Sequence, residues 1–357
     1  MEKALNILAS PLDWGLGHAT RMLPLLRYLQ QEGHHLHIGV NELTLDLLKE
    51  QLPEANFHYV PSYQIRYSNS AYTFSMLSLI PRILRAKKKE YRWVQDFVKD
   101  KPIDLIISDS RFGFYHPHIP SVIISHQLRL QYPKYYLPLA WLAQRNNERY
   151  LKKFQQIWVP DFEDHLLSGK LSENSSLKAY YISPQSRLQP CEKASPLDKS
   201  YVLCILSGPE PERSVLEELL IKQAASINKH LVMIGGRPFA KNVETHDPNL
   251  TYFNHLNDVD MACYIQYADL VISRSGYSSI MDYYQLQSKR LFLIPTPGQT
   301  EQLYLAQHLK KMHICDFAEQ KEFNLQLITE KAFFGEGFKA SYHKNVDFDI
   351  LIAALII

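Results

Sequence analysis

Residues 268–282 read Ala-Asp-Leu-Val-Ile-Ser-Arg-Ser-Gly-Tyr-Ser-Ser-Ile-Met-Asp. A short apolar run, Leu270–Ser273, leads through the small residues Ser275 and Gly276 into a segment with helical spacing that ends near Leu286. A buried strand, a glycine turn and a helix form the repeating unit of a parallel α/β sheet. Because backbone N–H groups at such a helix start bind anions, this stretch predicts a diphosphate site.

The same alternation continues on both sides of this stretch. In the second half, strands are predicted at 201–206, 230–234, 250–253, 270–273 and 290–294, with helices at 213–225, 261–267, 277–286 and 301–310. In the first half, strands are predicted at 4–9, 36–40, 57–60, 103–108, 121–125 and 156–159, with helices at 16–31, 43–51 and 93–99. Strands that alternate with helices predict doubly wound parallel sheets.

Residues 169–199 interrupt this pattern, because they are rich in Ser, Pro, Lys and Asn and lack an apolar period. We place the inter-domain region here. The sequence therefore predicts one Rossmann-like domain at 1–185 and a second Rossmann-like domain at 186–335. Residues 336–357 are predicted to be a helical tail that packs on the body of the protein. Two such halves describe the GT-B architecture, an α/β fold in which parallel sheets face each other across a cleft.

Length and charge limit the class of protein. A chain of 357 residues suits two domains, and 46% hydrophobic with 21% charged residues is typical of a globular protein. A net charge of +2 gives no support to nucleic-acid binding, which needs a strong basic excess.

The four cysteines, Cys191, Cys204, Cys263 and Cys315, are widely spaced and contain no CxxC pair. We expect neither a disulfide framework nor a zinc site, and we expect Cys204 and Cys263 to be buried free thiols. This pattern fits a reducing cytoplasm. No apolar run reaches about 18 residues, and no secretory signal precedes Asp13, so we expect a cytoplasmic protein without a membrane span.

Residues 13–21 read Asp-Trp-Gly-Leu-Gly-His-Ala-Thr-Arg and follow the first predicted strand. Gly15 and Gly17 allow a tight turn at the carboxyl end of that strand, where α/β proteins bind ligands. His18 would begin the next helix and act as a base near neutral pH. A dinucleotide-binding turn or a helix cap is the alternative, although Thr20 replaces the third glycine of the dinucleotide fingerprint.

Two further motifs lie in the second half. Asp282, two turns into its helix, is placed to accept hydrogen bonds from ribose hydroxyls, and the alternative is a solvent-facing carboxylate. After the loop that contains Pro297 and Gly298, the polar pair Glu301 and Gln302 begins a helix and is suited to bind sugar hydroxyls or simply to cap that helix. No DxD-type motif of the chain suggests a bound divalent ion, so we expect neither a metal nor a resident cofactor.

The order and spacing of the three motifs, together with 268–276, resemble the family 28 glycosyltransferases, the MurG-type N-acetylglucosaminyltransferases and their relatives. The resemblance is strongest over 200–315 and recognisable over 7–40. It implies a GT-B enzyme that inverts the anomeric carbon without a metal and uses a UDP-sugar as co-substrate. The acceptor stays unidentified.

The resemblance also implies roles for individual residues. His18 matches the base that assists deprotonation of the acceptor. On the donor side it implies phosphate contacts at Ser275, Gly276 and Tyr277, a ribose contact at Asp282, sugar contacts at Glu301 and Gln302, and base contacts by the backbone near His255 and Leu256. We add Gly208, Arg237, Arg274 and Gln299 to the donor side, and Gly15, Gly17 and Asp109 to the acceptor side.

The loop at 207–212 departs from the family pattern, because it contains one glycine, Gly208, and two acids, Glu210 and Glu212. Two carboxylates near a diphosphate repel it unless they turn outward. Arg237 is a candidate for compensating charge, and an ordinary surface arginine is the alternative. Asp109, likewise, is either a site residue or a cap for the loop after its strand.

Residues 72–92 combine an apolar and aromatic stretch with Arg82, Arg85, Lys87, Lys88, Lys89 and Arg92. Such a segment fits contact with an anionic membrane that delivers a lipid-linked acceptor, and a solvated helix is the alternative. Aromatic residues in 132–141 are candidates to line the acceptor side, whereas His116 and His118 are predicted to be loop histidines.

The sequence therefore predicts a glycosyltransferase that uses a UDP-sugar with inversion. Two alternatives stay open: a nucleotide-sugar epimerase, and a degenerate member that binds nucleotide or assists another subunit. Acceptor-dependent release of UDP would distinguish the transferase from both.

Overall fold

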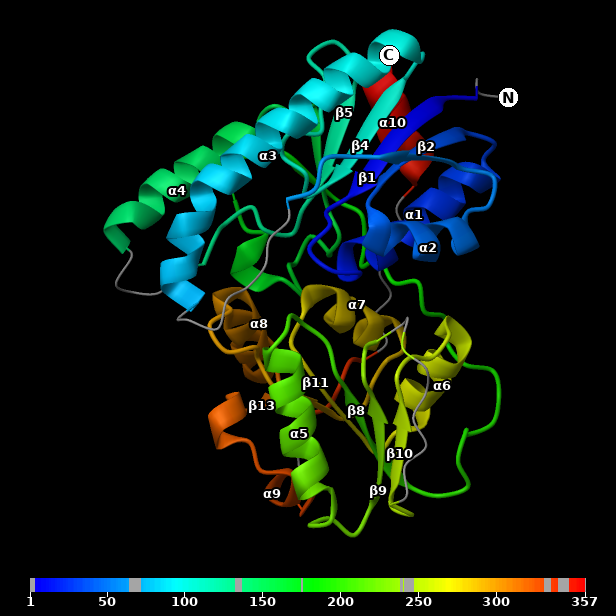
Figure 1. Ribbon diagram of the computed structural model, residues 1–357, viewed down its shortest axis with the longest axis vertical. Helices are drawn as coiled ribbons and strands as arrows, with labels where there is room; N and C mark the ends of the chain where they lie inside the picture. The colour runs from blue at the N-terminus through cyan, green and yellow to red at the C-terminus, as the bar shows by residue number, and fades with distance from the viewer. Residues whose placement is uncertain are drawn as a thin grey trace. The chain divides into compact units, whose positions relative to one another are not determined.

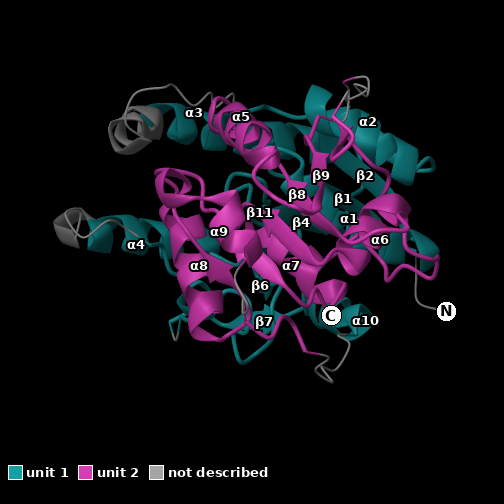
Figure 2. Cartoon of the chain, turned by 90° about the horizontal axis from the view of Figure 1, so that it is seen from below, with its two compact units in different colours: residues 1–185, 343–357 teal, residues 186–342 magenta. Residues whose placement is uncertain are grey.

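The computed structural model describes residues 4–63, 72–131, 137–174, 176–237, 240, 247–330, 335–339 and 347–356, without the side chains of 72–80 and 137–139. The chain divides into two compact units (Figure 2). Unit 1 comprises residues 1–185 and 343–357, and unit 2 comprises 186–342. The final segment of the chain therefore belongs to the first unit.

Unit 1 is built on one parallel sheet, in which the described strands follow the order β3-β2-β1-β4-β5-β6-β7 (Figure 1). These strands are β1 (Asn6–Pro11), β2 (His35–Val40), β3 (Asn56–Tyr59), β4 (Leu105–Asp109), β5 (Ser121–Ile124), β6 (Gln156–Val159) and β7 (Ala179–Tyr181). Its helices are α1 (Gly17–Gln31), α2 (Glu42–Gln51), α3 (Tyr72–Asp100), α4 (Leu137–Leu151) and α10 (Phe348–Ile356).

Unit 2 repeats this plan with a parallel sheet of order β10-β9-β8-β11-β12-β13. Its described strands are β8 (Tyr201–Ile205), β9 (His230–Ile234), β10 (Leu250–Phe253), β11 (Leu270–Ser273), β12 (Leu291–Leu293) and β13 (Asp316–Phe317). Its helices are α5 (Glu212–Ala224), α6 (Asp258–Tyr267), α7 (Tyr277–Gln285), α8 (Thr300–Lys311) and α9 (Leu325–Glu330). The α/β class and the GT-B arrangement of two parallel-sheet domains are confirmed.

The central strands are rich in apolar residues because helices cover both faces of a parallel sheet. Strands β4 and β5 are buried at every position. Apolar side chains of α1, including Met22 and Leu26, pack in the same core as Ile352 of α10. The α10 residue Phe348 also lies against Trp158 of β6, with ring centroids 5.7 Å apart.

Each sheet reverses its winding direction once. Strand β1 pairs with both β2 and β4, and its last residue, Pro11, is in register with Asp109. In unit 2, β8 pairs with both β9 and β11. Loops that leave neighbouring strands in opposite directions open a crevice at the carboxyl ends, which is where open α/β sheets bind ligands. The loops after β1 and β4, and those after β8 and β11, are therefore the places to examine.

Most predicted strands and helices lie within two residues of their observed bounds. Helix α3 is 29 residues long, whereas only 93–99 was predicted, because Pro81 and the basic residues obscure its apolar period. Helix α4 was not predicted. Strand β7 lies inside 169–199, the segment interpreted as an inter-domain region, and its three residues are too few to show a period. Among the described residues, none of the helices has the length and apolar character needed to span a bilayer.

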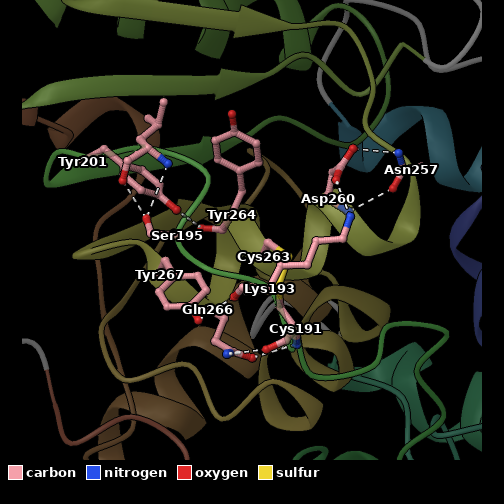
Figure 3. The surroundings of a disulfide bond; sticks show 11 residues. Cys191, Lys193, Ser195, Tyr201, Asn257, Asp260, Cys263, Tyr264, Gln266 and Tyr267 are labelled. Carbon is pink, nitrogen blue, oxygen red and sulfur yellow. Dashed lines mark hydrogen bonds and ion pairs between the residues drawn. A yellow bond between two sulfur atoms is a disulfide. The ribbon is translucent and has the colours of Figure 1, made fainter.

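The expectation that the cysteines form no disulfide, and that Cys263 is a buried free thiol, is wrong, whereas Cys204 is confirmed as a buried free thiol. Cys191 and Cys263 form a disulfide with their Cα atoms 5.0 Å apart, and only Cys204 and Cys315 are free (Figure 3). The bond joins the first segment of unit 2 to α6, where the Gln266 amide also bonds both backbone groups of Cys191, at 3.0 and 3.1 Å. A separation of 72 residues hid the pair, because sequence spacing does not show which cysteines meet in space. The expected absence of disulfides therefore no longer supports a reducing compartment.

Candidate functional site

The loop between β1 and α1 is shaped by a glycine and anchored to the neighbouring strand. Gly15 has a φ of 96°, a backbone conformation that side chains strongly disfavour. The backbone N–H of Leu12 donates to the carbonyl of Asp109 at 3.0 Å, and Asp13 accepts from the N–H of Tyr63 at 3.3 Å. The loop therefore delivers Gly17 and His18 to the crevice beside β4.

His18 and Asp109 meet there. The Nδ1 atom of His18 lies 3.2 Å from a carboxylate oxygen of Asp109, and the His18 side chain is 20% exposed whereas Asp109 is fully buried. Because a carboxylate only accepts hydrogen bonds, Nδ1 carries the proton and Nε2 carries the lone pair. The two residues, each predicted on its own, thus form a pair that leaves His18 with a basic nitrogen.

Arg21 keeps Asp109 ionised. Its Nε donates to Oδ2 of Asp109 at 2.7 Å, and its Nη2 donates to Oδ1. Burial favours the neutral acid, but the charge of Arg21 and the hydrogen bonds from Arg21 and His18 hold the pKa of Asp109 well below its usual range. Asp109 is therefore a fixed carboxylate rather than a simple loop cap.

His18 is itself held neutral. Its pKa is lowered from the ordinary value, first by burial and then by the charge of Arg21, and Asp109 only partly offsets both. A histidine with a lowered pKa remains a base at neutral pH. Arg21 and His126, which lies close to Arg21, were not predicted, although Arg21 stands in the quoted motif three residues after His18.

In unit 2, the turn after β11 offers open space in front of Gly276. This residue has an ordinary φ of −70°, and a Cβ added to it would meet only Ser279 Oγ, at 4.0 Å. Neither the backbone conformation nor the packing requires glycine here, although glycine is a common N-cap residue, and the turn is open to close approach by a ligand. Helix α7 follows with Tyr277 and has no acidic residue in its first turn, so the positive end of its dipole is not offset there.

Ser275 and Gln302 connect the two helix starts of this region. Ser275 Oγ donates to the Gln302 carbonyl at 2.8 Å, which ties the turn before α7 to α8. The Gln302 side chain accepts from the Thr296 N–H at 2.9 Å and donates to the Gln299 side chain at 2.5 Å. Gln302 and Gln299 thus hold the loop before α8, while Glu301 beside them is partly exposed.

Asp282 lies on α7 and accepts a hydrogen bond from Ser186 Oγ at 2.5 Å. Burial raises its pKa to about 6, and this hydrogen bond and the charge of Arg187 only partly counter that rise. Arg187 also pairs with Asp258 at the start of α6, at 2.6 Å. His255 and Leu256, predicted to contact the base, lie between β10 and α6, with Leu256 buried and His255 partly exposed.

Two arginines predicted for the donor side bond to the protein itself. Arg274 is fully buried and donates to backbone carbonyls of Glu212 and Ile294 and to the Gln320 side chain, at 2.7, 3.2 and 2.6 Å. Arg237 donates to both Glu217 oxygens and to the Tyr252 hydroxyl.

In the loop at 207–212, the Glu210 side chain turns toward the start of α5, the helix that follows this loop. Gly208 has a φ of 96°, and Glu210 accepts from Arg213 at 2.9 Å and from the Ser214 N–H at 3.2 Å. Burial opposes ionisation of Glu210, but these hydrogen bonds outweigh it and lower its pKa. The charge of Glu210 is thus paired with Arg213 at the start of α5.

His116 and His118, which were predicted to be loop histidines, contact each other within a loop. Nδ1 of His116 accepts from the backbone N–H of His118 at 3.2 Å. Within the described ranges, no three His, Cys, Asp or Glu residues are arranged to hold a metal ion. The aromatic residues 132–136 predicted for the acceptor side lie outside the described residues.

Part of the chain matches a known protein family. Residues 212–332 match the glycosyltransferase family 28 C-terminal domain. An uncharacterized glycosyltransferase of Methanosarcina mazei is 23% identical over 309 residues, which covers 81% of this chain and 79% of that protein.

Solved structures with the same fold include several glycosyltransferases. The calicheamicin glycosyltransferase CalG4 matches with a TM-score of 0.66 at 15% identity, over 92% of this chain and 88% of that one. MurG of Acinetobacter baumannii matches with 0.56 at 13%, over 92% and 90%. The spinosyn rhamnosyltransferase SpnG, complexed with thymidine diphosphate, matches with 0.61 at 13%, over 91% of both chains. The chain therefore has the GT-B fold, its residues 212–332 match the family 28 C-terminal domain, and both the family match and the Methanosarcina mazei relative support a glycosyltransferase.

Proposed function

We propose that this chain transfers a sugar from a UDP-sugar to an acceptor hydroxyl, with inversion at the anomeric carbon. The observation that carries the proposal is the His18–Asp109 pair, which leaves a neutral imidazole with its Nε2 lone pair at the crevice of unit 1. Unit 2 supplies the donor-binding groups through the turn at Gly276 and helix α7.

The proposed step is a direct displacement. His18 Nε2 accepts the proton of the acceptor hydroxyl while the acceptor oxygen bonds to the anomeric carbon. The bond from that carbon to the diphosphate oxygen breaks, and UDP leaves with the electron pair. General-base assistance of this kind contributes about 10²- to 10⁴-fold to rate. Asp109 stabilises the imidazolium that forms, because its carboxylate is already ionised.

The leaving diphosphate is stabilised in this proposal by the amino end of α7. Backbone N–H groups and the helix dipole favour negative charge there, and no first-turn carboxylate opposes it. We therefore expect transfer to persist in the presence of a chelator. The pairing of Glu210 with Arg213 supports activity over the degenerate alternative, because it offsets the charge of one of the two acids at 207–212.

The first experiment is a calorimetric titration of the full chain with UDP and with thymidine diphosphate. We expect UDP to bind more tightly, because Asp282 would accept from the ribose 2′-hydroxyl that the deoxynucleotide lacks. Asp282→Ala should weaken UDP at least tenfold, which is about 1.4 kcal/mol. Glu218→Ala removes an exposed carboxylate of the same unit and serves as the control.

Transfer is then measured as UDP release from a UDP-sugar, with and without candidate acceptors. His18→Asn should leave UDP affinity unchanged and lower acceptor-dependent release by two orders of magnitude or more, about the range of general-base catalysis. An isomerised free nucleotide sugar would indicate the epimerase instead. Failure of the folded protein to bind UDP would rule out the UDP assignment.

We also propose that unit 1 contacts an anionic membrane, from which a lipid-linked acceptor would be drawn. On α4, Trp141 and Leu142 are 61% and 53% exposed, and on α3 Leu84 is 46% exposed beside the exposed basic residues Lys88 and Lys89. The two helices touch where Lys87 Nζ lies 3.8 Å from the centre of the Tyr150 ring. Apolar side chains next to cations fit an anionic lipid surface.

Vesicle sedimentation tests this contact. We expect binding to phosphatidylglycerol-containing vesicles that weakens with salt, and weaker binding to pure phosphatidylcholine. Replacing Trp141 and Leu142 by Ser should reduce binding at least about tenfold, given roughly 1.5 kcal/mol or more per buried apolar side chain. Leu327→Ser, at a leucine on α9 of unit 2 that is 67% exposed, is the control. Equal binding by both variants would overturn the contact.

A further inference from the structure

The guanidinium of Arg21 acts on two histidines of unit 1: on His126 directly and on His18 through Asp109. Arg21 follows His18 by one helical turn on α1 and is 3% exposed. Besides its two bonds to Asp109, Arg21 places Nη1 3.3 Å from Nδ1 of His126, just after β5. Arg21, Asp109 and His126 thus come from α1, the end of β4 and the end of β5.

The chemistry of these contacts fixes where each histidine carries its proton. A guanidinium only donates hydrogen bonds, so Nδ1 of His126 accepts and the proton of this neutral imidazole lies on Nε2. A carboxylate only accepts, so Nδ1 of His18 donates and its lone pair lies on Nε2. The two imidazoles are therefore held in opposite tautomers.

We propose that Arg21 is the positioning residue of this site, fixing the tautomers of His18 and His126 and keeping His18 neutral. The proposal rests on the proposed function in one respect only, namely that His18 serves as the base. Arg21 acts through Asp109 on His18 and directly on His126. The result is a base at the start of α1 and a hydrogen-bond donor just after β5, each with a fixed tautomer.

The charges around His18 support this role. The titratable groups that face it are Arg21 from its own helix, Asp109 from β4 and His126 from the segment after β5. Arg21 and burial lower the pKa of His18, and Asp109 raises it. Removing Arg21 would leave the Asp109 carboxylate uncompensated beside His18. The pKa of His18 would then rise, because only burial and His126 would still oppose the effect of the Asp109 charge.

Nitrogen NMR of the full chain with labelled histidines measures both properties without a substrate. Single His18→Gln and His126→Gln variants assign the signals. We expect the wild type to show protonated Nδ1 on His18, protonated Nε2 on His126, and a His18 pKa below the ordinary value. Arg21→Met should raise the His18 pKa and mix the tautomers of His126. Arg27→Met, on the same helix but bonded to Gln51, is the matched control.

Arg21→Lys separates charge from geometry. A single ammonium retains the positive charge, so the His18 pKa should stay low, but it cannot bond Asp109 twice and also reach His126. The His126 signals should therefore change, and this variant decides the question if Arg21→Met does not fold. Unchanged tautomers and pKa values in the Arg21 variants would overturn the proposal. Opposite tautomers in a protein that transfers no sugar would instead count against the proposed function alone.

Discussion

At the scale of single residues, substitution of two glycines of unit 2 by alanine should have opposite effects on ligand binding and on folding stability. Gly276 has an allowed φ and open space around its Cβ position, whereas Gly236 has a φ of 66° and a Cβ there would lie 2.4 Å from the Leu206 carbonyl oxygen. Gly276→Ala should leave the free energy of unfolding within about 0.5 kcal/mol and weaken UDP binding. Gly236→Ala should destabilise the fold. Urea unfolding and calorimetry of both variants check this, and unchanged UDP affinity in Gly276→Ala would contradict the ligand role of that turn.

The raised pKa of Asp282 predicts that donor binding depends on pH. Its pKa is raised to about 6, chiefly by burial, so the free protein takes up a proton as the pH falls through that value. Binding of ribose hydroxyls requires the carboxylate, and affinity for a UDP-sugar should therefore fall below about pH 6. The intact nucleotide sugar is the right ligand, because the terminal phosphate of free UDP itself titrates at about pH 6. Asp282→Asn should bind weakly at every pH. The same pH slope in Asp282→Asn would exclude Asp282 as its source.

At the scale of elements, Arg274 joins the ends of several pieces of unit 2. It donates to the start of α5, to the segment after β12 and to Gln320, and it is fully buried. Arg274→Met would leave these acceptors without their donor, so we expect a loss of about 3 kcal/mol in unfolding free energy. Arg213→Met breaks a partly exposed pair and should cost less than about 1 kcal/mol. Equal losses in urea unfolding would show that burial of Arg274 adds nothing.

These elements also show which features of the structure could be predicted from the sequence. Short apolar runs are enough to predict the strands, and the glycine turns and His18 follow from their positions at strand ends. The partners of Asp109, Arg237 and Arg274 could not be predicted, because each lies 15 to 91 residues away along the chain. Only the strand order, which sets β1 beside β4, brings Asp109 to His18. The donor contacts of unit 2 stay predictions, since the structure shows these residues bonded within the protein.

At the scale of the whole molecule, the disulfide and the tryptophans fall in different units. Cys191–Cys263 closes a loop within unit 2, whereas the four tryptophans of the chain, Trp14, Trp93, Trp141 and Trp158, all belong to unit 1. Tryptophan fluorescence therefore reports the unfolding of unit 1, and far-ultraviolet circular dichroism reports both units. A perturbation confined to the disulfide should separate the two signals.

We expect reductant to lower the stability of unit 2 by about 2 to 4 kcal/mol, because a cross-link between residues far apart restricts the unfolded chain. In urea, the circular dichroism transition should then begin earlier while the fluorescence transition stays in place. The Cys191→Ser/Cys263→Ser double variant should match the reduced protein and be insensitive to reductant, which removes any effect of Cys204 and Cys315. Thiol titration of the unfolded, unreduced chain should find the two free cysteines. Four reactive thiols would refute the disulfide, and equal shifts of both optical signals would show that the two units unfold as one.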